Sequence, residues 1–340
     1  MPPNQTTAHL TELPRLAPQL EFLGPDELDR RPFVAVDGAP PDGAALALAH
    51  WPGSGTPAEL GAPTATEIAW RYLHVAHRGA EVVEVVTNNH VDEDGLLSAW
   101  VLTSRPGAAD AQIAIATATA GDFAVWDDDW IARRMIALEA AAEPATTPFW
   151  AVTRALSART RANPSGPVHR ALLPKIASIL SAPDRYEYLW RARWQRVLAD
   201  IDLLDAGVAT LTDAPDADAV LVRTPRPLDE LAVHPRTDRG VVVTSLPDGR
   251  VTAIQRYESW VEFAPESTRE RISLVPVAAE LSALDPGARW RGDGPEIARA
   301  KLSATDAMGN AVPAGLDAAV VIEALARARQ AAPGGGPRLL

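Results

Sequence analysis

The run Val82–Thr87 constrains the fold most strongly, because it consists almost entirely of β-branched residues and predicts a buried strand. Apolar runs at 33–36 and 44–49 also predict short strands that end in turns. Between these runs and the long strand, Thr64 and Glu67 have the spacing of a capping box and predict a helix to about residue 77. The alternation of strands and helices predicts a parallel α/β sheet, whose ligands bind beyond the carboxyl ends of the strands.

The rest of the chain changes character twice, and the predicted fold class is α/β with a smaller second domain. The parallel-sheet N-terminal domain is followed by a helical connection and then by a β-rich α+β C-terminal domain. Residues 108–120 stay ambiguous, because their many alanines favour a helix while Ile113 and Ile115 alternate with polar positions as in a strand. The expected parts are an N-terminal arm (1–30), the α/β domain (31–145), the helical connection (146–206), the β-rich domain (207–332, with helices near 273–284, 295–302 and 314–331) and a disordered tail (333–340).

Composition excludes several classes of function. The chain has 44 acidic and 32 basic residues and a formal net charge of −12, so its overall field repels phosphate backbones and we expect no general nucleic-acid binding. It has no cysteine, which excludes disulfides, iron–sulfur clusters and thiolate zinc sites and leaves His, Asp and Glu as metal ligands. No targeting segment or long apolar stretch is evident, so we expect a cytoplasmic protein without a membrane partner; a homodimer stays open.

The polar loop after the predicted strand 82–87 concentrates candidate metal ligands. His90, Asp92 and Asp94 alternate along the chain and are followed by Gly95, which permits a backbone bend. In an extended backbone these alternate side chains lie on one side and can converge on one point. Hard carboxylates without a thiolate favour Mn²⁺ or Mg²⁺. The alternative is an ordinary solvated turn, in which Asp and Gly serve only the turn.

The stretch from Val85 to Ala99 resembles the first motif of DHH-type phosphoesterases, in which a strand is followed by a His-x-Asp-x-Asp loop and a helix. The resemblance implies that His90, Asp92 and Asp94 bind two Mn²⁺ or Mg²⁺ ions and take part directly in phosphoester hydrolysis. The Asp-His-His triplet that names the family is absent from this sequence.

The resemblance also directs attention to other residues. It implies an Asp at the end of the next strand, for which Asp122 is the candidate if residues 112–119 form a strand. His50, after an early strand, and His234 are candidates for the imidazoles that the missing triplet would supply, with His50 as a metal ligand and His234 near the substrate.

Arg256 is a candidate for substrate binding, because a guanidinium group pairs with two phosphate oxygens at once. The alternative is a half-buried strand in which the arginine forms an ion pair. Asp127–Asp129, in contrast, are better explained as a helix cap than as a metal cluster.

The sequence therefore predicts a metal-dependent phosphoesterase that acts on a small nucleotide or another small phosphorylated substrate. The alternative is a non-catalytic protein that binds a ligand or a partner on a DHH-like fold.

Overall fold

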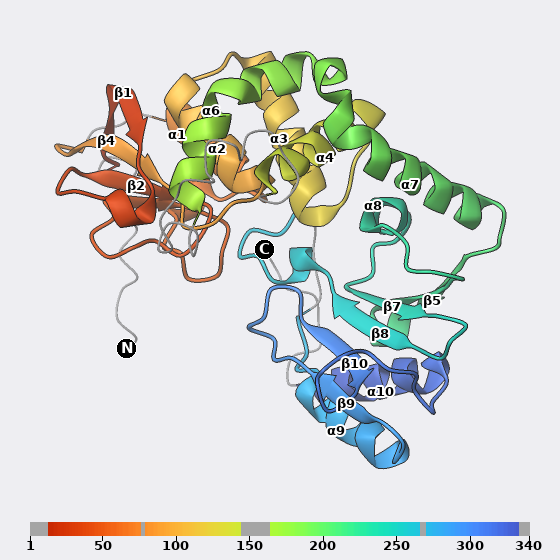
Figure 1. Ribbon diagram of the computed structural model, residues 1–340. Coiled ribbons are helices and arrows are strands. Elements are labelled where there is room, and N and C mark those ends of the chain that lie inside the picture. Colours follow the sequence, from red (N-terminus) through yellow and green to blue (C-terminus); the bar gives the residue numbers. More distant parts are fainter. Residues whose placement is uncertain (1–12, 76–78, 144–163, 266–269, 333–340) are drawn as a thin grey trace, which may run out of the picture. The chain divides into compact units, whose positions relative to one another are not determined.

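The computed structural model describes residues 13–75, 79–143, 164–265 and 270–332. These residues form two compact units, each with its own core (Figure 1). Among these residues, the first unit comprises those up to 122 and those from 126 to 194, and the second comprises 123–125 and those from 195 onward. The boundary near residue 194 falls inside the long helix α7 (Glu187–Asp205), within the segment expected to connect the domains.

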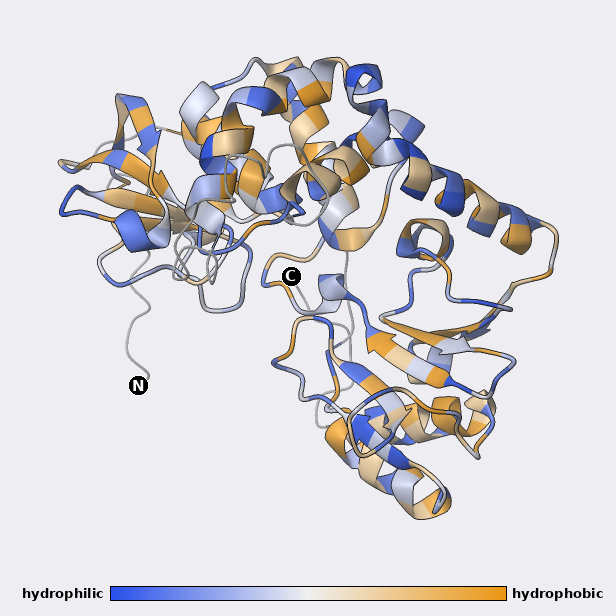
Figure 2. Cartoon of the chain, viewed as in Figure 1, coloured by the Kyte–Doolittle hydropathy of each residue, from blue (hydrophilic) through white to orange (hydrophobic). Residues whose placement is uncertain are grey.

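The first unit contains a four-stranded sheet in which every paired strand runs parallel, as predicted. Its strands are β1 (Arg15–Phe22), β2 (Phe33–Val36), β3 (Leu46–Leu48) and β4 (Val82–Thr87), in the spatial order β1-β4-β2-β3. Figure 2 shows mainly hydrophobic residues along β2 and β3, and every residue of these two strands is buried.

The expectation of an N-terminal arm over residues 1–30 is wrong for residues 15–22, which form the edge strand β1. The strand pairs with β4 on either side of a register shift between Leu16 and Glu21. Pro18 lies in this interval and has no amide hydrogen for the ladder, a residue tolerated at a sheet edge. The proline conceals the strand in the sequence.

Helices of the first unit pack on the sheet and on one another. Helix α2 begins directly after the polar loop and packs against β1, β2 and β4, with α1 and α6 beside it. Residues 108–120, ambiguous in the sequence, lie in helix α3, where the hydroxyls of Thr117 and Thr119 donate to the carbonyls four residues earlier. The helices are α1 (Ala65–His74), α2 (Glu93–Ser104), α3 (Ala108–Phe123), α4 (Asp129–Ala142), α6 (Ser165–Ser181) and α7. Short 3₁₀ helices lie at Pro25–Glu27, Ala58–Leu60 and Pro183–Tyr186.

Two of the predicted helix starts are confirmed. Helix α1 begins after Thr64, whose side chain accepts a hydrogen bond from the amide of Glu67. Helix α4 begins after Asp128, whose carboxylate accepts from the amide of Trp130. The aspartates at 127–129 therefore include a helix cap, as predicted.

The second unit is the predicted β-rich α+β fold. Its six-stranded sheet has the order β5-β6-β7-β8-β10-β9, in which only β6 and β7 pair in parallel. One sheet face packs on α9 and α10 around a core that includes Leu281, Trp290 and Leu302. The strands are β5 (Thr210–Ala214), β6 (Ala219–Arg223), β7 (Val241–Ser245), β8 (Val251–Gln255), β9 (Arg289–Gly292) and β10 (Lys301–Thr305). The helices are α8 (Glu230–Val233), α9 (Val275–Leu284) and α10 (Ala318–Ala331), with 3₁₀ helices at Pro215–Ala217, His234–Arg236 and Tyr257–Ser259.

One secondary-structure expectation in this unit is wrong. The segment 295–302 was expected to be helical, whereas Lys301 and Leu302 begin strand β10. Pairing of β10 with both β8 and β9 satisfies its backbone on two sides, and this overrides a local helix preference. Among the described residues, no helix combines the length and the apolar composition needed to cross a bilayer.

Candidate metal-binding site

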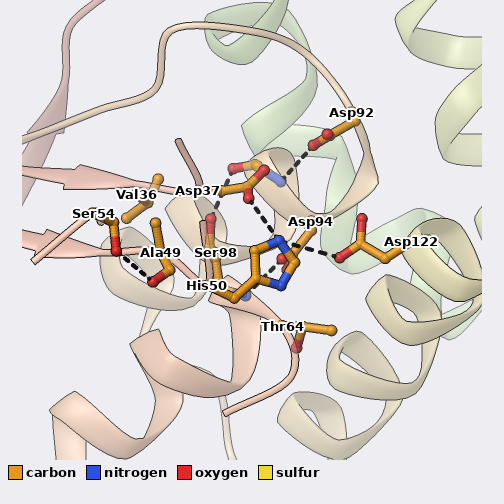
Figure 3. A network of polar contacts seen from close by, with 12 residues as sticks. Val36, Asp37, Ala49, His50, Ser54, Thr64, Asp92, Asp94, Ser98 and Asp122 are labelled. Carbon is orange, nitrogen blue, oxygen red and sulfur yellow. Dashed lines mark hydrogen bonds and ion pairs between the residues drawn. The ribbon is translucent and has the colours of Figure 1, made fainter. Parts of the chain in front are cut away.

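Three strands of the parallel sheet deliver polar side chains to its carboxyl edge. Asp37 directly follows β2 and His50 follows β3. The loop after β4 carries His90 and Asp92, and Asp94 lies in the first turn of α2. Strands β4, β2 and β3 are neighbours in the sheet, so Asp37 and His50 meet although they lie apart in the sequence (Figure 3). His90, after β4, reaches Asp37 in the same way. This is the edge at which parallel α/β sheets bind ligands.

Asp37, His50 and Asp94 form one set of ligand atoms, which we call the buried group. All three residues are buried, and their ligand atoms lie within 4.8 Å of one another. Nε2 of His50 lies 3.5 Å from Oδ1 of Asp37 and 3.8 Å from Oδ2 of Asp122, which approaches from α3 (Figure 3). Nδ1 of His50 faces the carbonyl oxygen of Pro63. This carbonyl can only accept, so Nδ1 carries a proton and Nε2 is the atom that faces the carboxylates.

Asp37, His90 and Asp92 form a second set, which we call the open group. Nε2 of His90 lies 3.3 Å from Oδ2 of Asp37 and 2.9 Å from Oδ2 of Asp92. The side chains of His90 and Asp92 are 31% and 36% exposed, so this group can be reached from solvent. The indole ring of Trp51 lies beside the His90 ring, with 5.3 Å between the centroids.

Asp37 belongs to both groups and offers one oxygen to each. Oδ1 faces His50 and Oδ2 faces His90. Two cations that share a carboxylate lie about 3.5–4 Å apart in two-metal sites, and a carboxylate between two imidazoles is suited to that arrangement. Asp37 also has a φ of 42°, in the left-handed region that is unfavourable for a residue with a side chain. The fold therefore imposes backbone strain at the residue that joins the groups.

The ligand atoms fit a hard divalent cation. Cis ligands of an octahedral Mg²⁺ ion, at about 2.1 Å from the metal, are about 3 Å apart. The separations of 3.3 Å and 3.5 Å between the imidazoles and Asp37 are close to that spacing, and both are longer than a good hydrogen bond between these atoms. Imidazole nitrogen and carboxylate oxygen are the donors that Mn²⁺ accepts.

The electrostatics of the cluster favour a cation as well. Burial and the charges of Asp92 and Asp94 raise the pKa of Asp37 well above its usual value. Burial and the same neighbouring carboxylates, with Asp94 acting most strongly, raise the pKa of Asp122. Burial alone would lower the pKa of His90, but the charges of Asp92 and Asp37 and the hydrogen bond to Asp92 raise it to about 11. His90 thus behaves as the local cation of a site with excess negative charge, a role that a divalent ion performs more strongly.

Asp92 is a helix cap as well as a member of the open group. Its Oδ1 accepts from the amide of Gly95 at the start of α2, while its Oδ2 faces His90. Burial would raise the pKa of Asp92, but the charge of His90 and these hydrogen bonds lower it. The carboxylate therefore stays ionised and keeps an oxygen directed toward the open group.

Asp94 differs from the other carboxylates because its oxygens are bound by helix α1. Oδ2 accepts from the amide of Ala65 at 2.6 Å, and Oδ1 accepts from the amide and the hydroxyl of Thr66 at 2.8 Å and 2.6 Å. These donors form the amino-terminal end of α1, where the helix dipole stabilises a negative charge. Asp94 therefore joins α1 to α2 and also belongs to the buried group, so its role as a metal ligand stays a prediction.

The other sequence candidates divide between the two units. Asp122 lies beside His50, although it comes from the end of a helix and not from the strand that the resemblance implied. His234 and Arg256 belong to the second unit.

The contacts of these two residues are with their own unit. Nδ1 of His234 lies 2.9 Å from the carbonyl oxygen of Phe123, and burial and the nearby Arg256 lower the pKa of His234 to about 4. The guanidinium of Arg256 pairs with Glu258 and donates to the carbonyl of Thr237 at 2.6 Å. The ion pair of the alternative is confirmed, but Arg256 is buried and directly follows β8 instead of lying in a half-buried strand. Among the residues that the structure describes, neither belongs to a group of converging metal ligands.

Sequence reasoning missed Asp37, the residue that the two groups share. In the sequence Asp37–Gly38 resembles a simple turn after a short strand. The available signal was its position directly after a buried strand of a predicted parallel sheet, the same criterion that identified His90.

Residues 18–311 match a family of unknown function, DUF6687. No curated protein matches the chain.

Proposed function

We propose that this chain, which belongs to the DUF6687 family of unknown function, is a metal-dependent hydrolase of small phosphoesters. The proposal rests on one observation: Asp37 offers one oxygen to each of two groups of metal-ligating side chains at the carboxyl edge of a parallel sheet. This arrangement supports the resemblance to DHH-type phosphoesterases. Mn²⁺ or Mg²⁺ is the cofactor that the donor atoms favour.

Each residue of the site would have a distinct role in metal binding. Bound divalent ions would activate a water molecule as the nucleophile and stabilise the attacking and leaving oxygens of the phosphoester. Asp37 would hold the two positions at a fixed separation. His50, oriented by the Pro63 carbonyl, would supply the buried position, with Asp122 as a further carboxylate ligand. His90 and Asp92 would supply the exposed position, where substrate can approach.

The charge of the molecule favours a small substrate. A net charge of −12 opposes the approach of a long polyanion, whereas a small phosphoester experiences mainly the local field of the bound cations. A nucleotide or another small phosphorylated metabolite meets this condition.

Hydrolysis of bis(p-nitrophenyl) phosphate by the full-length protein tests the proposal. We expect turnover with Mn²⁺, none with a chelator, and a loss of more than about 100-fold in Asp37→Asn, because a shared ligand matters more than an outer-sphere partner. Asp42→Asn is the matched control, since Asp42 is exposed in the loop that follows Asp37. Metal-dependent turnover that survives in Asp37→Asn would refute the proposed site.

The alternative function is binding without catalysis on the same fold. The engagement of Asp94 by α1 favours it, because the buried group then depends on fewer available carboxylate oxygens. Mn²⁺ that stabilises the protein against heat without hydrolysis of any phosphodiester or phosphomonoester probe would support this alternative.

A further inference from the structure

Asn88 connects the ends of two neighbouring strands at the base of the site. It follows β4 and is buried, with only 1% of its surface exposed. Its Nδ2 donates to the carbonyls of Val36 and Asp37, each at 3.2 Å, and its Oδ1 accepts from the amide of His90 at 2.7 Å. One amide side chain thus binds the backbone of Asp37, where φ is unfavourable, and the backbone of His90.

Asn89 performs a related task on the side chain of His90. Its Nδ2 donates to the carbonyl of Ala39, in the loop after β2, at 3.1 Å. Its Oδ1 lies 2.8 Å from Nδ1 of His90. An amide oxygen only accepts, so Nδ1 of His90 carries a proton and Nε2 is the atom left to face Asp37 and Asp92.

Two glycines provide the space for these amides. A Cβ on Gly95 would lie 2.4 Å from Nδ2 of Asn88, and a Cβ on Gly38 would lie 2.8 Å from Oδ1 of Asn89. Neither distance is compatible with a side chain unless the asparagine moves. Both amides are therefore packed against backbone as well as hydrogen-bonded, which fixes their position.

We infer that Asn88 and Asn89 are positioning residues for two different parts of the metal site, an inference that rests on the proposed function. Asn88 holds the backbone of Asp37, the ligand common to both groups, so it governs both metal positions. Asn89 orients only the imidazole of His90, so it governs the open position alone. Outer-sphere partners of this kind typically contribute 10- to 100-fold to metal affinity.

Mn²⁺ titration of the full-length protein, followed by the electron paramagnetic resonance of free Mn²⁺, tests the inference without reference to turnover. We expect the wild type to bind two ions. The affinity for both should fall by about 10-fold or more in Asn88→Ala, and the affinity for only one should fall in Asn89→Ala. Asn89→Asp should restore the affinity for that ion, because a carboxylate also accepts a hydrogen bond from Nδ1 of His90. Asn310→Ala, in the second unit, is the matched control and should bind as the wild type does.

The outcomes separate this inference from the proposed function. Two ions bound without hydrolysis would contradict the proposed function and leave the inference intact. Wild-type affinities in both variants, or the same loss of both ions in both variants, would overturn the inference. A wild type that binds no Mn²⁺ would overturn both.

A double-mutant cycle tests the geometry in metal-free protein and guards against a variant that fails to fold. Gly95→Ala should lower the melting temperature of the wild type more than that of Asn88→Ala, because the new methyl group collides with the Asn88 amide. An equal loss in both backgrounds would show that Asn88 does not occupy the position on which the inference depends.

Discussion

Replacement of Asp94 by alanine separates its structural role from any role in metal binding. In metal-free protein the change removes the acceptor of three hydrogen bonds from the start of α1. Ala65 and Thr66 are both buried, so their two amides lose their acceptor without gaining water. A buried donor without an acceptor costs about 1–3 kcal/mol, and relief of the repulsion from the nearby carboxylates offsets part of this. We therefore expect Asp94→Ala to lower the free energy of unfolding by about 3 kcal/mol.

The matched comparison is Asp92→Ala in the same loop. Asp92 accepts one amide hydrogen bond as a helix cap, from Gly95, and the loss of such a cap costs about 1 kcal/mol. Urea denaturation with a chelator present, followed by tryptophan fluorescence, measures both changes. Seven of the nine tryptophans that the structure describes belong to the first unit, so the signal reports mainly on the unit that contains the site. Equal losses in the two variants would refute the assignment of Asp94 as the residue that fastens α1 to α2.

Three further changes have defined outcomes. His169 is buried and its pKa is lowered to about 4, so its contribution to stability is full above the unfolded pKa of about 6.5 and declines as the pH falls toward 4. In urea denaturation the wild type should therefore lose about 2 kcal/mol of stability between pH 7 and pH 5 that His169→Gln does not lose. The same pH dependence in both proteins would contradict this. Gly121→Ala places a methyl group 3.0 Å from Oε2 of the buried Glu93. Overpacking should outweigh the higher helix propensity of alanine and destabilise the protein by about 1 kcal/mol. A higher melting temperature would contradict the close contact between Gly121 and Glu93. The guanidinium of Arg133 lies 4.4 to 5.2 Å from the ring centroids of Trp130, Trp190 and Trp194. Arg133→Met should therefore lower the free energy of unfolding by about 1–2 kcal/mol and alter tryptophan emission. Unchanged emission would argue against these cation–π contacts.

The sequence predicts the architecture correctly where the local residue pattern and the tertiary structure agree. The β-branched run of β4 and the cap at Thr64 both predict the elements that form. Strand β1 was not accessible, because Pro18 interrupts its pattern and its pairing partner β4 lies far along the chain. Helix α3 was predicted only ambiguously. Its alternating residues suggest a strand, but its alanines favour a helix, and the hydroxyl of Thr117 donates to a carbonyl within the same helix.

The site was accessible only in part, because local spacing determines backbone proximity but not side-chain direction. The alternation of His90, Asp92 and Asp94 predicted convergence in an extended loop. Helix α2 instead begins at Glu93, so Asp92 becomes its cap and Asp94 turns toward α1. Local pattern places Asp37 at the end of a strand but does not show that it meets His90, because this contact arises from the pairing of β2 with β4.

The central claim is that Asp37 joins two metal positions. Anomalous diffraction from crystals of the full-length protein soaked in Mn²⁺ tests it most directly. The account predicts two peaks about 3.5–4 Å apart, one near each carboxylate oxygen of Asp37, with His50 beside one peak and His90 beside the other. A single peak, or peaks that do not touch Asp37, would contradict it.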